Sequence, residues 1–537
     1  MQDHCGIDAA EKLTLPEMFW QEARRSLRKF CMADSTGQRL SFAQALIASV
    51  ALAEKLKQRL NTEQNIGILI PSSVAGVLTN VAVSLLKKVP ININFTTSPE
   101  AMASIIRQCE MRWIITSRAF LEKVPLKPQA ELIFVEDLVK QIKAQDKILA
   151  AFKAFLWPGF LSQGLLFGWR KRDIEDLATI MFTSGSTGDP KGVMLTHANI
   201  ASNLEGLYQV FHMEDKEILL GILPLFHSFG FTAIQWFPLI SGAGVIYHGN
   251  PLDAKMVGRL VEKFKVTILM ATPTFLNMYT QRCSKEQFKS LRVAVVGAEK
   301  LKESVARAFC DKFGIEPMEG YGCTELSPIV SLNLPDFRGK GPRQRSAKPG
   351  TIGMPLPGIA VRIVDLKTGE TRGPDEEGLL LVKGPNIMKG YWRRAEATRE
   401  VMREGWYVTG DMAKMDVDGF ITITDRLSRF SKIGGEMVPH LRVEEAVHEI
   451  LNVSEQVCVV TSIPDEKKGE QLAVLCLQDV DVSSVVEALR KSGLPRLWIP
   501  DPKNFLQVDA IPMLGTGKVD LGKVRRIALK TFQGGST

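Results

Sequence analysis

Short apolar runs alternate with longer amphipathic stretches through most of the chain. The apolar runs have the length of buried strands, and the stretches between them, such as residues 40–60 and 253–264, have helical spacing. This strand–helix alternation predicts a parallel sheet with helices on its faces. The predicted strands are residues 66–70, 113–116, 178–182, 266–270 and 293–296.

The pattern changes after Gly353. Short strands at residues 361–364 and 379–382 are separated by turns rich in Gly and Pro, which predicts a small antiparallel or barrel region.

A further mixed unit follows Asp425. It contains a predicted helix at residues 443–451 and predicted strands at 456–460 and 472–477. We therefore place a domain boundary near residues 425–430. The predicted domains are residues 1–425 and 426–537.

One segment, FLWPGFLSQGLLFGWRKR at residues 155–172, is rich in Phe, Leu and Trp and ends in three basic residues. It is too short to span a bilayer. Two interpretations stay open. The aromatic residues enter the headgroup region while residues 170–172 face anionic lipid, or the segment packs in the core or against another subunit. Pro158 and Gly159 predict a break in the helix.

The composition is that of an ordinary globular protein. Of the 537 residues, 45% are hydrophobic and 23% are charged, which excludes a disordered or low-complexity chain. The formal net charge of +8 favours acidic partners such as phosphates, anionic lipid or an acidic protein. The sequence has no zinc-finger spacing and no RNA-binding aromatic signature, so we expect no nucleic-acid partner.

The cysteines and the N-terminal sequence bear on the compartment. The eight cysteines are scattered and form no CxxC pair, which is typical of reduced thiols in the cytosol. The N-terminal sequence lacks the basic region and apolar core of a signal peptide. We expect a cytoplasmic protein, with residues 155–172 as the part that would hold it at the inner face of a membrane.

The stretch TSGSTGDPK at residues 183–191 has the composition of a phosphate-binding loop. Its glycines permit positive φ and close approach of the backbone, its hydroxyl groups are hydrogen-bond donors, and its lysine adds a positive charge. A Walker loop is excluded because Pro190 precedes the lysine and Gly192 follows it. Taken alone, the stretch is also compatible with a flexible surface turn. The candidate phosphate-binding residues are Thr183, Ser184, Gly185, Ser186, Thr187, Gly188 and Lys191.

Further motifs follow this loop. They are PLFHSFG at 224–230, GAE at 297–299, YGCTELSP at 321–328, YVTGD ending at Asp411, DRLSRFSKIGGE at 425–436, and PMLGTGKVD, which contains Lys518. Together with TSGSTGDPKGVMLTH, the series resembles the acyl-adenylate-forming enzymes, which include acyl-CoA synthetases, luciferases and the adenylation domains of peptide synthetases. The resemblance covers residues 178–524. It implies a large N-terminal domain of layered α/β subdomains plus a small β-barrel, followed by a small, mobile α+β C-terminal domain.

The resemblance implies a reaction in two halves. A carboxylate attacks the α-phosphate of ATP and expels pyrophosphate, and a thiol then attacks the acyl-adenylate and releases AMP. ATP and Mg²⁺ are the implied cofactors, with Glu325 as the Mg²⁺ ligand and Thr324 as a phosphate contact. Lys518 would bridge the carboxylate and the α-phosphate, and His227 would line the carboxylate site.

The resemblance also implies a nucleotide pocket. Tyr321 would stack on adenine, Asp411 would accept hydrogen bonds from the ribose hydroxyls, and Arg426 would contact ribose or phosphate. Each of these residues also has an ordinary alternative, such as a core tyrosine or a turn aspartate. The other expected nucleotide-pocket residues are Gly297, Ala298, Glu299, Glu319 and Gly320. The expected acyl-pocket residues are Phe229, Phe231 and Trp236.

For the second half, the resemblance implies that the C-terminal domain rotates about a hinge. Rotation would bring Lys432 to the adenylate phosphate, while Gly434 and Gly435 leave room for a pantetheine arm. The sequence departs from the family pattern at two positions. Ser428 stands at the hinge position, where Asp or Lys is usual, and Asp425 stands where the family has Gly, so the pivot stays open.

The stretch RFSKIGGEMVPHLRVEEAVHEI is most similar to the synthetase part of bifunctional acyl–acyl carrier protein synthetase/2-acylglycerophosphoethanolamine acyltransferases. This resemblance implies a long-chain fatty acid and an acyl carrier protein as substrates, and the positive net charge suits an acidic carrier protein. The alternative is a fatty acyl-CoA synthetase, since CoA is anionic and ends in the same thiol. His248 and Asp253 have acyltransferase spacing but lie inside the adenylation domain, so we interpret them as a coincidence and expect synthetase activity alone.

An inactive relative that binds nucleotide or lipid is a rival of another class. The joint presence of Lys518, Glu325, Asp411 and Arg426 argues against it, because a binding module has no need of all four.

Overall fold

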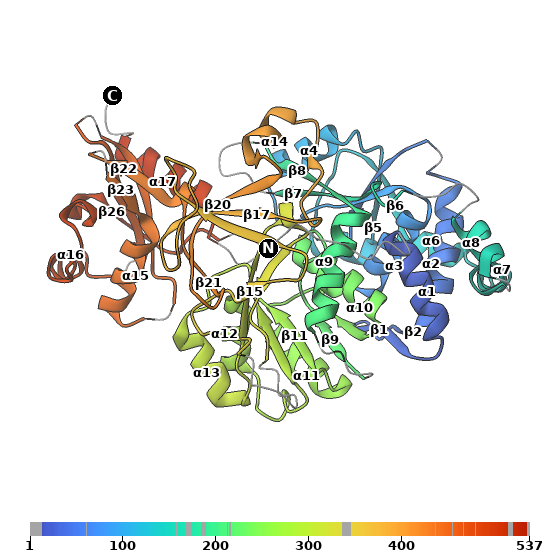
Figure 1. The fold of residues 1–537 in the computed structure, drawn as a ribbon. Coiled ribbons are helices and arrows are strands. Elements are labelled where there is room, and N and C mark those ends of the chain that lie inside the picture. The colour runs from blue at the N-terminus through green and yellow to red at the C-terminus, as the bar shows by residue number, and fades with distance from the viewer. Residues whose placement is uncertain are drawn as a thin grey trace. The chain divides into compact units, whose positions relative to one another are not determined.

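The computed structural model describes residues 13–533, apart from residues 61, 157–158, 168–172, 184–188, 212, 214–215, 336–344, 435, 454, 466, 478–479 and 514–518. The chain forms two compact units, whose elements are labelled in Figure 1. Unit 1 consists of Met1–Gly185, Asp189–Val361 and Val382–Tyr407, and unit 2 consists of Ser186–Gly188, Arg362–Leu381 and Val408–Thr537.

The largest sheet of unit 1 has nine strands in the order β15-β14-β13-β12-β11-β9-β10-β1-β2. The strands from β13 to β1 are parallel, whereas β14 and β15 at one end of the sheet and β2 at the other pair antiparallel. The segments that follow the parallel strands therefore meet at one edge of the sheet, where open α/β sheets bind ligands. The bounds are β1 Phe30–Asp34, β2 Arg39–Ser41, β9 Ile218–Gly221, β10 Gly244–Tyr247, β11 Ile268–Ala271, β12 Val293–Val296, β13 Met318–Gly322, β14 Ile329–Leu332 and β15 Met354–Pro355.

Helix α11 (Ala254–Phe264) illustrates how the sequence builds the layers of this sheet. Asp253 caps the helix by accepting a hydrogen bond from the backbone N–H of Met256 at 3.0 Å. Val257 and Val261 are fully buried and share a core with Leu269 of β11, while the polar face of the helix is exposed. Figure 1 shows α11 next to β9 and β11, together with α12 (Pro273–Arg282) and α13 (Glu303–Phe313).

Unit 1 has two smaller sheets. One is parallel, in the order β4-β3-β5-β6, and the other is antiparallel, in the order β18-β8-β7. Their bounds are β3 Asn65–Leu69, β4 Val89–Asn92, β5 Trp113–Thr116, β6 Glu131–Phe134, β7 Leu177–Thr183, β8 Lys191–Thr196 and β18 Gly390–Tyr391.

The parallel pairing predicted for residues 178–182 is wrong. This run forms β7, which pairs antiparallel with β8 in the register Thr183↔Lys191. The physical reason is the short connection, since β8 begins at Lys191 and a crossover between parallel strands needs about a dozen residues.

Unit 2 contains most of an antiparallel sheet in the order β16-β17-β20-β19, with β21 pairing β20, and a second sheet in the order β23-β22-β25-β24, with β26 pairing β25. Alternation along β24 divides the second sheet between two cores. Cys458 and Val460 pack with helices α15 and α16, whereas Val459 packs with α17. The bounds are β16 Ala360–Val364, β17 Gly378–Lys383, β19 Met402–Arg403, β20 Trp406–Met415, β21 Ile421–Arg426, β22 Phe430–Ile433, β23 Glu436–Pro439, α15 His440–Leu451, β24 Cys458–Asp465, β25 Gly469–Leu477, α16 Val482–Lys491, β26 Phe505–Val508 and α17 Leu521–Gln533.

Each strand and helix predicted from the hydrophobic pattern overlaps an element of the matching type. The helix break predicted from Pro158 and Gly159 is confirmed, because α7 ends at Phe155 and α8 begins at Gly159. Residues 170–172 lie outside the described part of the chain. The remaining helices are α1 Leu15–Arg25, α2 Phe42–Lys57, α3 Val74–Leu85, α4 Pro99–Gln108, α5 Arg118–Lys123, α6 Val135–Gln141, α7 Ala144–Phe155, α8 Gly159–Phe167, α9 His197–Val210, the π-helix η1 Gly230–Trp236, α10 Phe237–Ser241, the 3₁₀ helices η2 Thr324–Leu326, η3 Leu427–Arg429, η4 Arg496–Trp498 and η5 Pro502–Asn504, and α14 Ala395–Val401.

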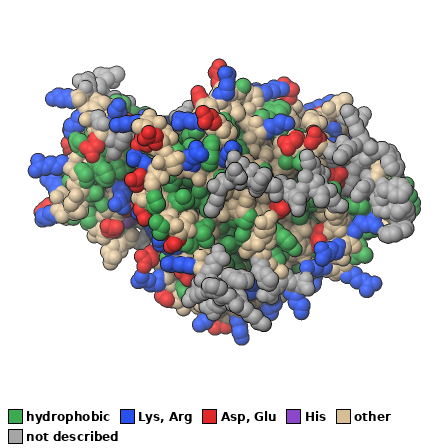
Figure 2. Space-filling view, in the orientation of Figure 1, with side chains coloured by type: hydrophobic (Ala, Val, Ile, Leu, Met, Phe, Trp, Pro, Cys, Tyr) green, Lys and Arg blue, Asp and Glu red, His purple; other side chains and the backbone are tan. Residues whose placement is uncertain are grey.

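Among the described residues, no helix combines the length and the apolar character needed to cross a membrane. Figure 2 shows basic and acidic side chains interspersed over the face in view, so the net charge of +8 is not gathered into one patch there.

Candidate functional site

The segments after β12 and within β13 form one edge of the candidate site. Val296, the last residue of β12, pairs with Glu319 of β13, so the GAE and EGY segments lie side by side. A Cβ on Gly297 would lie 3.3 Å from the backbone O of Gly320, closer than most side chains tolerate. Ala298 has a positive φ of 73°, which fixes a tight turn at this edge.

Two glutamates hold this turn. Glu299 accepts a hydrogen bond from the Thr274 hydroxyl at 2.7 Å, and Glu319 accepts one from the backbone N–H of Leu301 at 3.0 Å. Burial raises the pKa of Glu319 to about 7, against the opposing effects of the Leu301 N–H and of Lys300. The two side chains that were expected to contact nucleotide therefore also stabilise the turn.

A second cluster in unit 1 connects the loop lysine to the expected metal ligand. The Tyr391 hydroxyl donates a hydrogen bond to Glu325 Oε1 at 2.8 Å. Lys191 Nζ lies 5.2 Å from the centroid of the same tyrosine ring, a cation–π distance. Ser228 Oγ donates to Thr324 Oγ1 at 3.2 Å, which links the PLFHSFG segment to the TE pair.

Tyr391 is a site residue that the sequence motifs did not identify. It lies on β18, which pairs with β8 and so comes close to Lys191. Burial, followed by the neighbouring Glu325 carboxylate, raises the pKa of Tyr391, so the phenol stays protonated and can donate. The tyrosine belongs to no quoted motif, and only the strand pairing reveals it.

The π-helix η1 begins at Gly230, shortly after the candidate histidine, His227. The backbone N–H of Phe231 donates to the carbonyl of His227 at 2.8 Å, and a Cβ on Gly230 would lie only 2.0 Å from the carbonyl O of Pro224. Glycine is therefore required where the chain turns back on itself. Phe229 lies against Gly297, since a Cβ on that glycine would be 3.7 Å from the phenyl ring.

The other two expected acyl-pocket residues lie on η1 and are packed in the protein interior. Phe231 and Trp236 are fully buried, with ring centroids 6.1 Å apart in an edge-to-face arrangement.

Within unit 2, Asp411 and Arg426 form an ion pair across β20 and β21. Arg426 Nε lies 2.7 Å from Asp411 Oδ1, and the aspartate side chain is only 4% exposed while the arginine is 52% exposed. Lys432 is exposed on β22, and Gly434 follows that strand with a positive φ of 58° and open space around its Cα.

Several predicted site residues lie outside the described part of the chain. They are Ser184, Gly185, Ser186, Thr187, Gly188, Gly435 and Lys518.

The comparisons with known proteins bear directly on this arrangement. The family model for "AMP-binding enzyme" matches residues 19–392. The chain belongs to the AMP-binding enzyme family. The predicted superfamily is therefore confirmed.

The relatives that this chain matches are named for different acid substrates. The chain is 34% identical over 356 residues to the long-chain-fatty-acid–CoA ligase of Bacillus subtilis, a match that spans 64% of this chain and 60% of the relative. It is 33% identical over 360 residues to a feruloyl-CoA synthase of Amycolatopsis, spanning 66% and 70%. A long-chain-fatty-acid–CoA ligase of Yersinia pestis is 28% identical over 543 residues, spanning 96% and 94%.

Solved structures of this fold confirm the predicted fold class. The ATP-bound MatB of Rhodopseudomonas palustris superposes with a TM-score of 0.79 at 24% identity, covering 97% of this chain and all of that one. The o-succinylbenzoate CoA synthetase MenE of Bacillus subtilis, in complex with its acyl-adenylate, gives 0.79 at 23% identity, with 95% and 98% covered.

The residues present fit the Mg²⁺ that the AMP-binding family implies. Protein-bound Mg²⁺ on a nucleotide takes one or two carboxylates plus phosphate oxygens and water. The described residues contain no group of three or more His, Cys, Asp or Glu that could hold a metal alone. Glu325, whose Oε1 accepts a hydrogen bond from Tyr391, would supply the single carboxylate that such a site needs.

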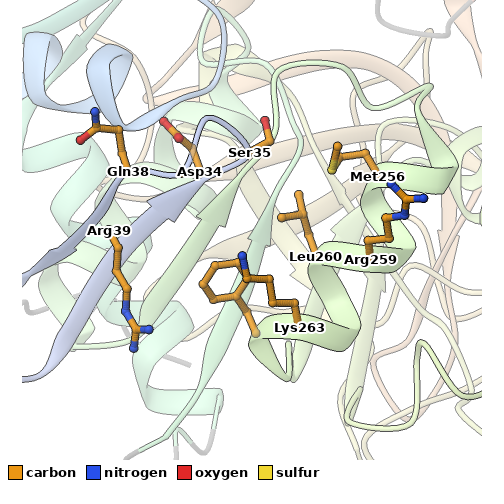
Figure 3. Close-up of a pocket in the computed structure, with 10 residues that line it drawn as sticks. Asp34, Ser35, Gln38, Arg39, Met256, Arg259, Leu260 and Lys263 are labelled. Atoms are coloured by element: carbon orange, nitrogen blue, oxygen red, sulfur yellow. The ribbon is translucent and has the colours of Figure 1, made fainter.

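A hollow of about 340 Å³ on unit 1 is separate from all of these residues. Figure 3 shows it between β1–β2 and α11, with Arg39 on one side and Arg259 and Lys263 on the other. None of the residues that the motifs identify lines it.

The His248–Asp253 pair has a structural role in this AMP-binding enzyme. Asp253 caps α11, its Oδ2 is 3.9 Å from His248 Nε2, and His248 Nδ1 lies 2.8 Å from Ser35 Oγ. Burial lowers the pKa of His248 and so favours the neutral ring.

Proposed function

We propose that this enzyme activates a fatty acid with ATP to give acyl-AMP and pyrophosphate, and then transfers the acyl group to a pantetheine thiol, releasing AMP. The observation that carries the proposal is the cluster of Lys191, Tyr391 and Glu325 beside Thr324. It places a cation, an anchored carboxylate and hydroxyl groups together, as a triphosphate and its Mg²⁺ require. The fatty acid ligases among the relatives support the same reaction.

The proposed roles follow from the chemistry of each side chain. Lys191 offsets charge on the phosphates. Gly297 lets the GAE and EGY segments pack closely, because a Cβ there would lie 3.3 Å from the backbone O of Gly320. Mg²⁺ held through Glu325 would neutralise the phosphates as the carboxylate attacks. Asp411 is the acceptor for the ribose hydroxyls, and its ion pair with Arg426 holds the carboxylate in place.

For the thiol acceptor we favour CoA. The three relatives named above are two CoA ligases and a CoA synthase, so they support the alternative in the sequence-based prediction better than the acyl carrier protein. The resemblance of residues 429–450 and the net charge of +8 keep the carrier protein as the second candidate.

The decisive assay offers holo acyl carrier protein and CoA side by side with ATP, Mg²⁺ and palmitate, with separate quantification of the two thioesters. Palmitoyl-CoA as the main product supports the CoA proposal, whereas palmitoylated carrier protein alone overturns it. Absence of pyrophosphate release with fatty acids of every length would contradict the ligase proposal itself.

We also propose that residues 155–172 contact a membrane surface. The proposal rests on the aromatic and basic composition of the segment, and Trp157 and Trp169 lie outside the described residues.

A further inference from the structure

Large apolar side chains are exposed together on three consecutive helices of unit 1. Twelve large hydrophobic side chains are exposed among the described residues, and five of them lie on α6, α7 and α8. The other seven are scattered along the chain from Leu27 to Met513. Single exposed apolar residues are normal, but a local group is typical of an interaction surface. The five are Val139, Ile148, Leu149, Phe152 and Leu165.

Three of the five exposed side chains lie on α7. This helix exposes its large apolar residues and buries small ones. Its exposed face carries Ile148 at 71%, Leu149 at 50% and Phe152 at 55% exposure, spaced as neighbours on one side of a helix. Its buried positions are the small residues Ala150 and Ala154. A surface helix ordinarily turns its large apolar residues inward. The exposed apolar face of α7 is therefore a candidate surface for a contact outside the chain.

The inward side of α7 is held to α2 by ion pairs. Lys153 Nζ lies 2.7 Å from Glu54, and Asp146 lies 3.0 Å from Lys55 Nζ. The indole N–H of Trp20 donates to the carbonyl of Ala154 at 2.9 Å. These contacts fix the rotation of the helix about its axis, so its apolar face stays outward.

Helix α8 is tied to the same framework. Arg24 donates to Ser162 Oγ at 3.3 Å, and Ser162 in turn donates to the carbonyl of Leu156 at the end of α7. Figure 1 shows α7 and α8 next to each other, beside α2 and α6. The two helices therefore form a supported pair at the edge of unit 1.

The charges around the apolar face are predominantly positive. Lys140, Lys143 and Lys147 are exposed, and none of them has an ion-pair partner among the residues that the structure describes. Two of the three acids on α6 and α7 form ion pairs, Asp137 with Arg118 and Asp146 with Lys55, and the third, Glu136, accepts hydrogen bonds from Ser117 and the backbone N–H of Arg118. Apolar residues beside unpaired lysines are typical of helices that lie in the interface of an anionic bilayer.

We propose that α7 docks on an anionic phospholipid bilayer. Ile148, Leu149 and Phe152 enter the headgroup region, and the three lysines contact anionic headgroups. A bilayer is favoured over a second copy of the chain, because a two-fold contact through α7 would bring the two sets of lysines together. This proposal extends the membrane contact proposed for residues 155–172 to include α7, and it rests on that part of the proposed function. It does not depend on which thiol or acid the enzyme uses.

The test is co-sedimentation of the full chain with vesicles of phosphatidylcholine and phosphatidylglycerol. The combined substitutions Ile148→Gln, Leu149→Gln and Phe152→Gln should lower vesicle binding by about tenfold or more. The matched control combines Leu252→Gln, Leu366→Gln and Val417→Gln, which are 60%, 47% and 81% exposed and lie outside α6–α8, and should bind as the unchanged protein does. Equal binding by the unchanged protein, the α7 variant and the control overturns the proposal.

Two further measurements distinguish docking on lipid from self-association of the chain. Lys143→Gln with Lys147→Gln should weaken binding to the anionic vesicles at low salt, and high salt should remove the difference. Sedimentation velocity without lipid should show the same oligomeric state for the unchanged protein and the α7 variant. A dimer that the α7 variant dissolves overturns the bilayer in favour of a second copy.

Ligase activity with a water-soluble short-chain acid should be the same in all variants, and thermal unfolding should confirm that each is folded. Failure of the ligase proposal would leave vesicle binding intact, and failure of vesicle binding would leave the soluble assay intact.

Discussion

Tyr391 is the residue on which the candidate site depends most directly. It contacts Lys191 through its ring and Glu325 through its hydroxyl, so one side chain orients both a cation and a carboxylate. A hydrogen bond to a charged group contributes about 1.5–3 kcal/mol, and each 1.4 kcal/mol corresponds to about tenfold in rate.

Tyr391→Phe should therefore lower fatty-acid-dependent pyrophosphate release by about 10- to 100-fold. The ring contact with Lys191 remains, while Glu325 loses its donor. A rise in the Mg²⁺ concentration needed for half-maximal rate would assign the loss to the metal site. The matched control is Tyr279→Phe, which removes another tyrosine hydroxyl hydrogen bond, to the carbonyl of Pro251 at 2.7 Å, without touching the site. Equal losses in both variants would contradict the orienting role.

Glu319 makes stability depend on pH. Its pKa is raised to about 7 in the folded state by burial, above the ordinary value of 4.5, so the folded protein binds this proton more tightly than the unfolded chain. The stability that comes from the protonated form is present below the unfolded pKa and is lost as pH rises from about 4.5 through 7.

Glu319→Gln keeps the acceptor for the Leu301 N–H and removes the titration. Between pH 5 and pH 8, the free energy of unfolding of the variant should rise by roughly 2–3 kcal/mol relative to that of the unchanged protein, because only the unchanged protein loses the stability of the protonated form. Denaturant titrations at matched pH measure this, and Glu316→Gln, at an exposed position nearby, is the control. A difference that does not change with pH would show that Glu319 is not held protonated.

The turn between β22 and β23 contains Gly434, one of the two glycines expected to leave room for the pantetheine arm. Gly434 has a positive φ of 58°, with nothing within 4 Å of an added Cβ. An alanine there would cost about 1–2 kcal/mol in backbone conformation but would meet no obstacle within the described residues. Any larger effect on thiol transfer would report passage of the pantetheine arm.

Gly434→Ala should therefore slow acyl transfer to CoA by at least about tenfold while adenylate formation changes less than about twofold. The control is Gly493→Ala, which has a positive φ of 81° and equally open surroundings in the same unit. Single-turnover measurements of the two half-reactions decide the question. Loss of transfer in both variants would assign the effect to backbone strain.

The elements also show what the sequence could predict. Apolar periodicity identified β3, β5, β11 and β12 because each lies in the middle of a parallel sheet and is made mostly of buried apolar residues. The antiparallel pairing of β7 was missed because a run of apolar residues carries no direction. The contribution of Tyr391 was missed for a related reason, since it reaches Lys191 only through the pairing of β18 with β8.

Several motif segments of unit 1 that are far apart in the sequence lie together in the structure. The GAE and EGY segments lie together because strand order brings consecutive parallel strands to one edge, and the TE pair follows the second of them. The reverse amphipathic character of α7 could have been read from Ile148, Leu149 and Phe152, but helical spacing alone does not say which face of a helix is buried.

At the scale of the whole molecule, the proposed reaction assigns its two halves to different positions of the C-terminal domain. The resemblance places Lys518 in the first half and Lys432 in the second. A substitution that affects one half-reaction and spares the other therefore tests the domain movement and not the nucleotide pocket alone.

Lys518→Ala should abolish adenylate formation, with a loss of at least about 100-fold, while transfer from supplied acyl-adenylate to CoA stays within about threefold. Lys432→Ala should affect the transfer half more strongly, and it serves as the reciprocal variant. Both halves are measured separately, by pyrophosphate release and by thioester formation. Equal loss of the two halves in Lys518→Ala would contradict the rotation scheme.

The path of the chain through the two units limits how the molecule can be taken apart. Arg362–Leu381 belongs to unit 2, Val382–Tyr407 to unit 1, and Val408–Thr537 again to unit 2. No single cut divides such a chain, and a truncation after Asp425 would carry 362–381 and 408–425 without the remainder of their unit. During synthesis on the ribosome, residues 362–381 of unit 2 emerge before residues 382–407, the last segment of unit 1. Unit 1 therefore cannot complete its fold before part of unit 2 has been synthesised.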